Sequence, residues 1–386
     1  MDVSPWLRPE AATSAGRLFC PVYGRGKGSA QMIPGWPYSV VAALEPGRAS
    51  WTAVLDAVRL RPDDDQTEVT AAQVRDVVTR LIEAGHWRDG DPAILVVFDA
   101  GYDVTRLAWL LAGLPVSVLG RLRSDRVMQL PAPPRRPGTT GRPRKHGGEL
   151  ALSDPATWPG PQVATSTMTS RSGMATAAAR DRVHPRLTRR AAWLDHDGDL
   201  PVIEGTLIRL QVDRLPGDRD PKPVWLWFSR TSATPAEVDR CWQAFLRRFD
   251  LEHTFRLFKQ VLGWTAPKIR TPDAADRWTW LIIACHAQLR LARRCAKTRQ
   301  ARTRQAARID QPPPGTPPRR GQNDEEGPHP QDTTRTRRLN GKLRGCLKTW
   351  MTWSSVAVPI QPGVRRVAGH DDDHGVSRQR DCMMCA

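Results

Sequence analysis

One short stretch constrains the fold more than any other, because residues 94–122 contain the signals of a strand, a helix and a second strand with little between them. Ile94–Phe98 is a continuous apolar run, which is typical of a strand covered on both faces. Asp103 can cap a helix over residues 104–112, and a second apolar run, Val116–Leu122, follows. Two strands joined in this way are expected to lie parallel in one sheet.

The residues before this stretch indicate the rest of the sheet. Residues 39–44 and 51–58 are predicted to be strands of an antiparallel meander, and residues 71–84 have helical periodicity. A meander followed by strand, helix and strand predicts a mixed α/β sheet with a central parallel pair. In open sheets, ligand-binding and catalytic residues lie at the carboxyl ends of the strands. Asp99 directly follows the predicted strand 94–98 and is at such an end.

The composition changes after residue 124. Residues 125–222 are rich in Pro, Gly, Arg and small polar residues, which favours an insertion that is partly β and partly disordered. Within residues 208–212 apolar and polar side chains alternate, as in a half-exposed strand, and residues 224–228 are apolar throughout, as in a buried one. The expected division of the chain is 1–124, 125–222, 223–300 and 301–386, the last being a disordered basic tail.

A long helix is predicted from an unusually complete start signal, with Thr234 as N-cap, Pro235 in the first helical position and Glu237 in the third. It should run to Leu262, and a second helix should cover residues 273–295. Five side chains fall on one narrow stripe of this otherwise apolar cylinder: Phe245, Arg248, Glu252, Arg256 and Lys259. Such a helix packs on several sides, so the stripe should face a groove or a partner. The alternative is a ladder of ion pairs worth a few tenths of a kcal/mol each.

The charge of the chain points to a polyanionic partner. Lys and Arg number 58 against 40 acidic residues, for a net charge of +18, which favours nucleic acid. No apolar run is long enough to span a bilayer, and we expect a soluble, cytoplasmic, nucleoid-associated protein. The seven Cys lack the spacing of a disulfide framework. Cys382 and Cys385 with His370 and His374 could bind zinc, or the segment is a disordered C-terminus.

The helix stripe carries a resemblance to a known family. The sequence resembles bacterial insertion-sequence transposases of the DDE type, whose RNase H-like core has its third acid in a Tyr–Arg–Glu–Lys helix. In that signature two residues separate Tyr from Arg, three separate Arg from Glu and six separate Glu from Lys. Phe245, Arg248, Glu252 and Lys259 match the spacing, with Phe in the Tyr position. The resemblance covers roughly residues 2–300.

The resemblance implies an α/β, RNase H-like catalytic core that is interrupted by the insertion, and a metal-dependent transposase. It implies Asp2, Asp99 and Glu252 as metal-binding and catalytic carboxylates. Two Mg²⁺ ions, for which Mn²⁺ can substitute, would activate the attacking oxygen and stabilise the leaving oxygen at a phosphodiester. Carboxylate oxygens suit Mg²⁺ because it is a hard cation. The expected reaction is DNA strand cleavage and strand transfer of an insertion sequence.

The resemblance also implies that the protein contacts DNA, both the transposon ends and the target. It further implies a homodimer on the DNA. Six side chains are expected to make the DNA contacts: Arg248, Arg256, Lys259, Phe245, Phe249 and Trp225. Arg248 and Lys259 would bind phosphates, while Phe249 and Trp225 are candidates for stacking on a flipped base. The basic stretches 121–145 and 290–348 would add salt-dependent affinity without sequence specificity.

Only Met1 precedes Asp2, so we expect the chain to be a transposase remnant truncated at its N-terminus. The alternative function is a non-enzymatic basic DNA-binding protein that retains the RNase H-like scaffold. An unrelated basic scaffold would instead leave Asp99 and Glu252 far apart.

Overall fold

The computed structural model describes residues 1–309 except 23–30, 46–49, 136, 139, 170–171, 195 and 215–220, with no side chains described for 294–309. The expected tail beyond residue 309 therefore lies outside the described residues, and so do Cys382, Cys385, His370 and His374. Among the described residues, no helix is both long and apolar enough to cross a bilayer.

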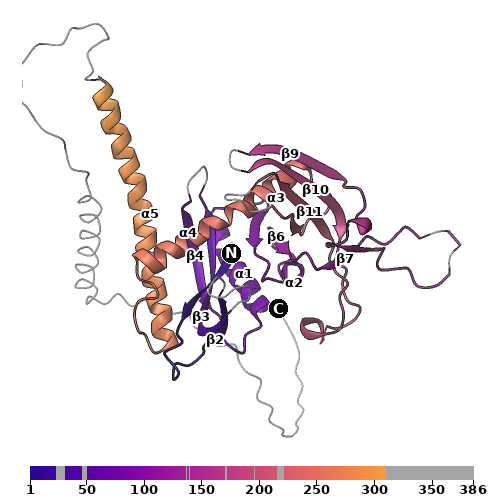
Figure 1. Cartoon of the computed structure of the whole chain (residues 1–386), viewed down its shortest axis with the longest axis horizontal. Coiled ribbons are helices and arrows are strands. Elements are labelled where there is room, and N and C mark those ends of the chain that lie inside the picture. Colours follow the sequence, from indigo (N-terminus) through magenta and orange to yellow (C-terminus); the bar gives the residue numbers. More distant parts are fainter. Residues whose placement is uncertain are drawn as a thin grey trace, which may run out of the picture. The chain divides into compact units, whose positions relative to one another are not determined.

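The first sheet is an antiparallel meander built around one long strand (Figure 1). Its strands are β1 (Asp2–Leu7), β2 (Leu18–Val22), β3 (Gln31–Leu44) and β4 (Thr52–Arg59). The central strand β3 pairs with β1 from Asp2↔Val40 onwards and with β4 on its other edge. The predicted meander strands at 39–44 and 51–58 are confirmed, whereas β1 and β2 have no counterpart in the sequence prediction.

The second sheet has six strands in the order β5-β6-β12-β11-β10-β9. They are β5 (Ile94–Phe98), β6 (Val116–Leu122), β9 (Val163–Thr169), β10 (Gly173–Val183), β11 (Gly205–Val212) and β12 (Val224–Phe228). As predicted, β5 and β6 are parallel, while the other pairs are antiparallel. The predicted strands at 208–212 and 224–228 lie within β11 and β12. By contrast, β9 and β10 come from a part of residues 125–222 whose small and polar residues indicated disorder. Smaller elements there are β7 (Val127–Gln129), β8 (Glu149–Ala151), η1 (Pro155–Thr157) and η2 (Ala191–Trp193).

Helices cover the sheets. They are α1 (Gln66–Glu83), α2 (Val104–Leu110), α3 (Pro235–Arg247), α4 (Phe249–Arg256) with a π-helical turn η3 (Leu257–Val261), and α5 (Pro272–Ile309). The capping box at Thr234 and the N-cap at Asp103 are both confirmed. The predicted single helix to Leu262 is interrupted at Arg248, and the second helix extends beyond residue 295.

Strand β12 shows how the two faces of the second sheet are covered. Trp225 and Trp227 belong to the core that contains α1 and α2, whereas Leu226 and Phe228 belong to the core that contains α3. Successive side chains of a strand point to opposite faces, so α3 lies across the sheet from α1 and α2. A third core joins the first sheet to α4, η3 and α5. The result is the mixed α/β, RNase H-like architecture that the sequence predicts.

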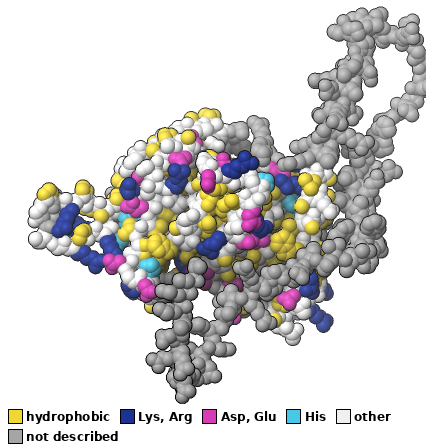
Figure 2. Space-filling view, turned by 180° about the vertical axis from the view of Figure 1, so that it is seen from behind, with side chains coloured by type: hydrophobic (Ala, Val, Ile, Leu, Met, Phe, Trp, Pro, Cys, Tyr) yellow, Lys and Arg dark blue, Asp and Glu magenta, His cyan; other side chains and the backbone are white. Residues whose placement is uncertain are grey.

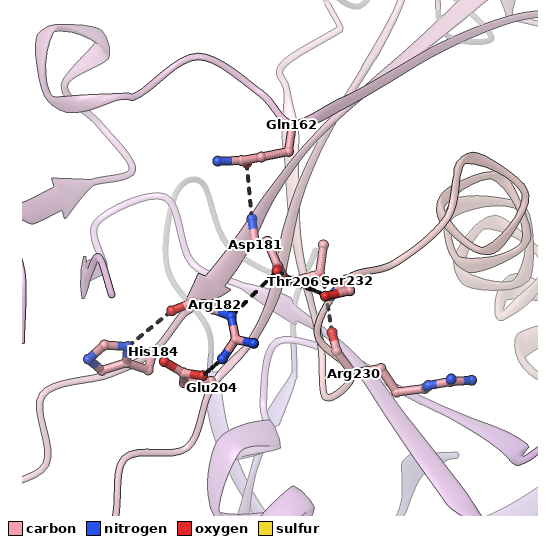
Figure 3. Close-up of polar contacts among 8 residues, drawn as sticks. All are labelled: Gln162, Asp181, Arg182, His184, Glu204, Thr206, Arg230 and Ser232. Carbon is pink, nitrogen blue, oxygen red and sulfur yellow. Dashed lines mark hydrogen bonds and ion pairs between the residues drawn. The ribbon is translucent and has the colours of Figure 1, made fainter. Parts of the chain in front are cut away.

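A polar network fixes the loop that leads into α3 (Figure 3). The carboxylate of Asp181, at the β-bulge of β10, accepts from the backbone N–H of Ser232 at 2.7 Å. The hydroxyl of Thr206 lies 3.4 Å from the same carboxylate and donates to the carbonyl of Arg230 at 2.7 Å. Ser232 has a φ of 56°, in the left-handed region. The inserted strands therefore hold the start of α3 in place.

Candidate active site

Two carboxylates from different sheets meet at one guanidinium group. Asp2 opens β1, and Asp99 directly follows β5. The backbone nitrogen of Met1 donates to the carbonyl of Val97 at 2.8 Å, which brings the start of β1 beside the end of β5. Nη1 of Arg248 lies 3.0 Å from Oδ2 of Asp99 and 3.9 Å from Oδ2 of Asp2. Asp2 and Asp99 thus lie around the same guanidinium group.

Arg248 is held rigidly between the two carboxylates and two aromatic rings. It occupies the junction of α3 and α4, and its side chain is only 5% exposed. Its guanidinium carbon lies 5.1 Å from the ring centroid of Phe245 and 4.6 Å from that of Phe249. Both separations are within the range of cation–π attraction. The group is therefore a fixed counterion rather than a mobile surface charge.

Burial sets the electrostatics of this site. It raises the pKa of Asp2, an effect opposed by the backbone N–H of Val3 and by the charge of Arg248. Burial also raises the pKa of Tyr102, and the carboxylates of Asp2 and Asp99 raise it further. Oδ1 of Asp99 is buried and has no hydrogen-bond partner among the described residues. The acidic pair therefore has an acceptor atom available for another cation.

The pair of Asp2 and Asp99 has the chemistry of a divalent-ion site. The two carboxylates already share a positive charge, and their hard oxygens are the ligands that Mg²⁺ prefers. Glu252, the expected third ligand, is exposed on α4 one helical turn after Arg248, on the same side of the helix. In the described part of the chain, no three His, Cys, Asp or Glu side chains are close enough to hold a metal ion. The structure thus assembles two of the three expected acids.

The expected DNA-contact residues fall into two groups. Phe249 is 46% exposed, and Arg256 is also exposed. Phe245 and Trp225 are buried in the cores on either face of the second sheet. Lys259 lies over the ring of Trp264 at 5.8 Å, and burial lowers its pKa. Of these five residues, only Phe249 and Arg256 are exposed, and Phe249 is the one of the two that contacts Arg248.

Positive charge is dispersed on the face of the molecule shown in Figure 2. There the described Lys and Arg side chains lie singly or in small groups among acidic and apolar ones. Many of the described Arg side chains are paired with acids, as in the contacts of Arg106 with Asp65 and Glu68. On this face the net charge does not form a stripe that would track a DNA backbone.

Two features of the site were not predicted from the sequence. Tyr102, which lies three residues after Asp99, is partly buried, and its hydroxyl oxygen is fully buried. Both carboxylates add to the rise in its pKa. The contact of Arg248 with both acids was not predicted either, since the sequence analysis assigned Arg248 only to DNA phosphate. The sequence shows Tyr102 close to Asp99, but its proximity to Asp2 depends on how the two sheets meet.

Comparison with known families agrees with this geometry. Residues 1–186 match the family described as DDE superfamily endonuclease. The matched region contains Asp2, Asp99 and Tyr102, and it ends before the helices that carry Arg248 and Glu252. No curated protein matches the chain. Residues 1–186 are thus similar to the DDE superfamily of endonucleases.

Proposed function

We propose that the protein is a DDE-type DNA transposase that cleaves DNA strands with divalent metal ions. The observation that carries this proposal is the convergence of Asp2 and Asp99 on a single cation, in a chain whose matched family consists of endonucleases. Two carboxylates forced together need a positive partner, and the reaction needs a metal at a scissile phosphate.

Asp2 and Asp99 would hold Mg²⁺, or Mn²⁺ in its place, with Glu252 as the third ligand. The ions would activate the attacking oxygen and stabilise the leaving one. Because the guanidinium of Arg248 lies 3.0 Å from Asp99 and 3.9 Å from Asp2, it has to move away from at least one of them before the site is loaded. Its guanidinium is then free to bind a DNA phosphate, which guanidinium groups recognise by paired hydrogen bonds. Phe249, exposed beside it, and Arg256, exposed two helical turns further along α4, would guide the strand.

Further parts of the proposal follow from the transposase function. The substrates would be the ends of an insertion sequence and a target DNA, joined by strand transfer. A homodimer on DNA, located with the nucleoid, would hold two ends together. The buried Phe245 and Trp225 and the partly buried Lys259 would support the site from within the fold.

A second candidate function has one observation in its favour. Arg248 supplies from within the chain the positive charge that a metal would otherwise supply to Asp2 and Asp99. A non-enzymatic DNA-binding protein with an RNase H-like scaffold would be stable in this state. It would bind DNA with an affinity that falls steeply with salt and does not depend on divalent ions.

Nicking of supercoiled DNA separates the two functions. The purified chain is incubated with plasmid and Mg²⁺ or Mn²⁺, beside Asp2→Asn, Asp99→Asn and Glu252→Gln. Asp103→Asn is the matched control, because Asp103 caps α2 and Asn caps a helix equally well. We expect nicking by the wild type and the control and none by the other variants. Nicking by both Asp99→Asn and Glu252→Gln would remove the assignment, and metal-independent binding without nicking would support the second function.

A further inference from the structure

Two arginine side chains lie together on the second sheet, at the end that is away from the N-terminus (Figure 1). Arg180 of β10 is opposite Leu207, and Arg209 of β11 is opposite Ala178. The two arginines are therefore diagonal neighbours on one face of the sheet, close enough for long side chains to meet. Arg180 is only 6% exposed, and Arg209 is half-buried.

The indole ring of Trp158 packs against both guanidinium groups. The guanidinium carbons of Arg209 and Arg180 lie 5.0 Å and 5.8 Å from the ring centroid, within the range of cation–π attraction. The ring is itself fixed, because its Nε1 donates to the carbonyl of Ala151 at 2.7 Å. It also packs edge-on against Trp225, with centroids 5.0 Å apart. The fold thus holds two positive charges in one place.

The hydrogen-bonding capacity of the two guanidinium groups is only partly used. Nε of Arg180 donates to the carbonyl of Pro159 at 2.8 Å, and Nη2 of Arg209 donates to Oε1 of Gln211 at 3.3 Å. Nη1 of Arg180 and Nε of Arg209 are buried and have no partner among the described residues. A buried donor without an acceptor is unfavourable, so we expect an acceptor at this place.

The charge of the pair also lacks a counterion. Burial lowers the pKa of Arg180, and the positive charge of Arg209 lowers it further. Within the part of the chain that the structure describes, no acidic group offsets these two effects. Arginine keeps its proton in proteins, and like charges brought together need an opposite charge nearby. A water molecule would accept hydrogen bonds here but would not balance the charge, whereas an anion does both.

The sheet leaves room for a ligand beside the two arginines. Their neighbours on the same face of β9 and β10 have small side chains, namely Ala164, Ser166, Thr176 and Ala178. Three of them, Ala164, Ser166 and Thr176, are exposed. A molecule bound at the guanidinium groups can therefore extend over this face of the sheet.

We propose that Arg180 and Arg209 bind a phosphate group with two negative charges, either free phosphate or a phosphate monoester. Two guanidinium groups match the charge of such a group, which is close to −2 near neutral pH. Its several oxygens also suit the paired hydrogen bonds that arginine donates. A phosphodiester within a DNA strand carries one charge and would leave the other uncompensated. The site is separate from Asp2 and Asp99, because Asp99 follows β5, at the opposite end of the sheet order.

Calorimetric titration of the full chain with three small probes tests the proposal. The probes are inorganic phosphate, thymidine monophosphate and a dithymidine joined by one phosphodiester. Arg180→Gln and Arg209→Gln each remove one guanidinium group from the site. Arg182→Gln is the matched control, because it removes the same charge from the same strand but from a side chain that is paired with Glu204.

We expect the wild type and the control to bind inorganic phosphate and thymidine monophosphate saturably. Arg180→Gln and Arg209→Gln should bind both at least about tenfold more weakly, because each loses charged hydrogen bonds to the ligand. The dithymidine should also bind the wild type at least about tenfold more weakly than thymidine monophosphate does. Tighter binding of thymidine monophosphate than of inorganic phosphate would identify a nucleotide or a strand end as the ligand, and the reverse would identify free phosphate.

Thermal unfolding shows whether the variants fold. Arg180→Gln should not melt below the wild type in the absence of phosphate, because it removes one of two charges that repel each other. Phosphate should raise the melting temperature of the wild type and of Arg182→Gln but not that of Arg180→Gln, because only a protein that binds the ligand is stabilised by it.

Three results would overturn the proposal. The first is equal affinity of the wild type and Arg180→Gln for thymidine monophosphate, and the second is the absence of binding of any probe to the wild type. The third is equal affinity of the wild type for the dithymidine and for thymidine monophosphate, which would show that the charge of the ligand does not matter. None of these measurements involves DNA cleavage or a metal ion, so this site is tested separately from the proposed function.

Discussion

Arg248 and Asp99, 149 residues apart in the chain, are joined by a hydrogen-bonded ion pair in which Nη1 and Oδ2 are 3.0 Å apart. The same nitrogen lies 3.9 Å from Asp2. Like charges brought together disfavour ionisation unless a counterion is near. Arg248 is that counterion here, and a divalent ion that binds the two carboxylates has to compete with it.

Replacement of Arg248 by Met should destabilise the fold and increase the amount by which Mg²⁺ stabilises it. Met keeps much of the length but leaves Asp2 and Asp99 facing each other without a cation. We expect a loss of roughly 1–3 kcal/mol in the free energy of unfolding at pH 7, less than for a fully buried pair, because the Asp99 side chain is 33% exposed. Urea unfolding with and without Mg²⁺ measures both effects, with Arg248→Lys as the charge-conserving control.

In this experiment Mg²⁺ should stabilise Arg248→Met more than the wild type, since the competing charge is gone. The loss in the free energy of unfolding caused by Arg248→Met should also become smaller as the pH is lowered towards 4. Burial raises the pKa of Asp2, so its contribution to stability is complete below the ordinary value of 3.8 and is lost as the pH rises through the folded pKa. Equal stabilisation of both proteins by Mg²⁺ would show that Arg248 does not occupy the cation position.

His286 should make the fold sensitive to mild acid. Its ring stacks on Trp51 with centroids 5.5 Å apart, and burial lowers its pKa to about 4, with the charge of Arg290 adding to the effect. In the unfolded chain His286 binds a proton below about pH 6.5, whereas in the folded chain it stays neutral until the pH approaches 4. The stability that neutral His286 contributes is therefore present above pH 6.5 and is lost as the pH falls towards 4. The free energy of unfolding should fall by up to about 3 kcal/mol.

The measurement for His286 is the free energy of unfolding as a function of pH, compared with His286→Gln. The difference between the two proteins should change between pH 6.5 and pH 4 and should be constant above 7. Parallel curves across this range would mean that His286 is protonated as easily in the folded as in the unfolded state.

Asp181 should contribute more to stability than its neighbour Glu204. Asp181→Ala leaves the N–H of Ser232 without its acceptor, at an expected cost of about 1–3 kcal/mol. Glu204 pairs with Arg182 across 2.8 Å, but exposed pairs of this kind are worth at most about 1 kcal/mol. Thermal unfolding of Asp181→Ala and Glu204→Ala gives the comparison, and a larger loss for Glu204→Ala would contradict this ranking. Ser232→Gly should cost little, because glycine adopts a φ of 56° readily.

Elements with strong local signals were predicted closely. Ile94–Phe98 and Val116–Leu122 are strands with the predicted bounds, because continuous apolar runs of that length fit few other structures. The interruption at Arg248 was not predictable, since the helical pattern continues through it. At this point the backbone N–H of Arg248 bonds to the carbonyl of Phe245, three residues back, and the side chain contacts two acids from distant parts of the chain.

The β9–β10 hairpin was also not predictable from the sequence alone. Its small and polar residues favour a loop, yet Ala175 and Ala177 are buried in the core that contains α3. Strand preference depends on what a side chain packs against, which a single sequence does not show. In the site, the pairing of Asp2 with Asp99 followed from the family resemblance. The bridging by Arg248 and the exposure of Glu252 required the structure.

The central claim is that Asp2 and Asp99 together hold a divalent ion, and calorimetric titration with Mn²⁺ tests it most directly. The wild type is compared with Asp2→Asn, with Asp99→Asn and with the control Asp103→Asn. We predict saturable binding to the wild type and the control, tighter binding to Arg248→Met, and at least about tenfold weaker binding to each of the two site variants. Equal Mn²⁺ affinity in the wild type and in Asp99→Asn would contradict the account.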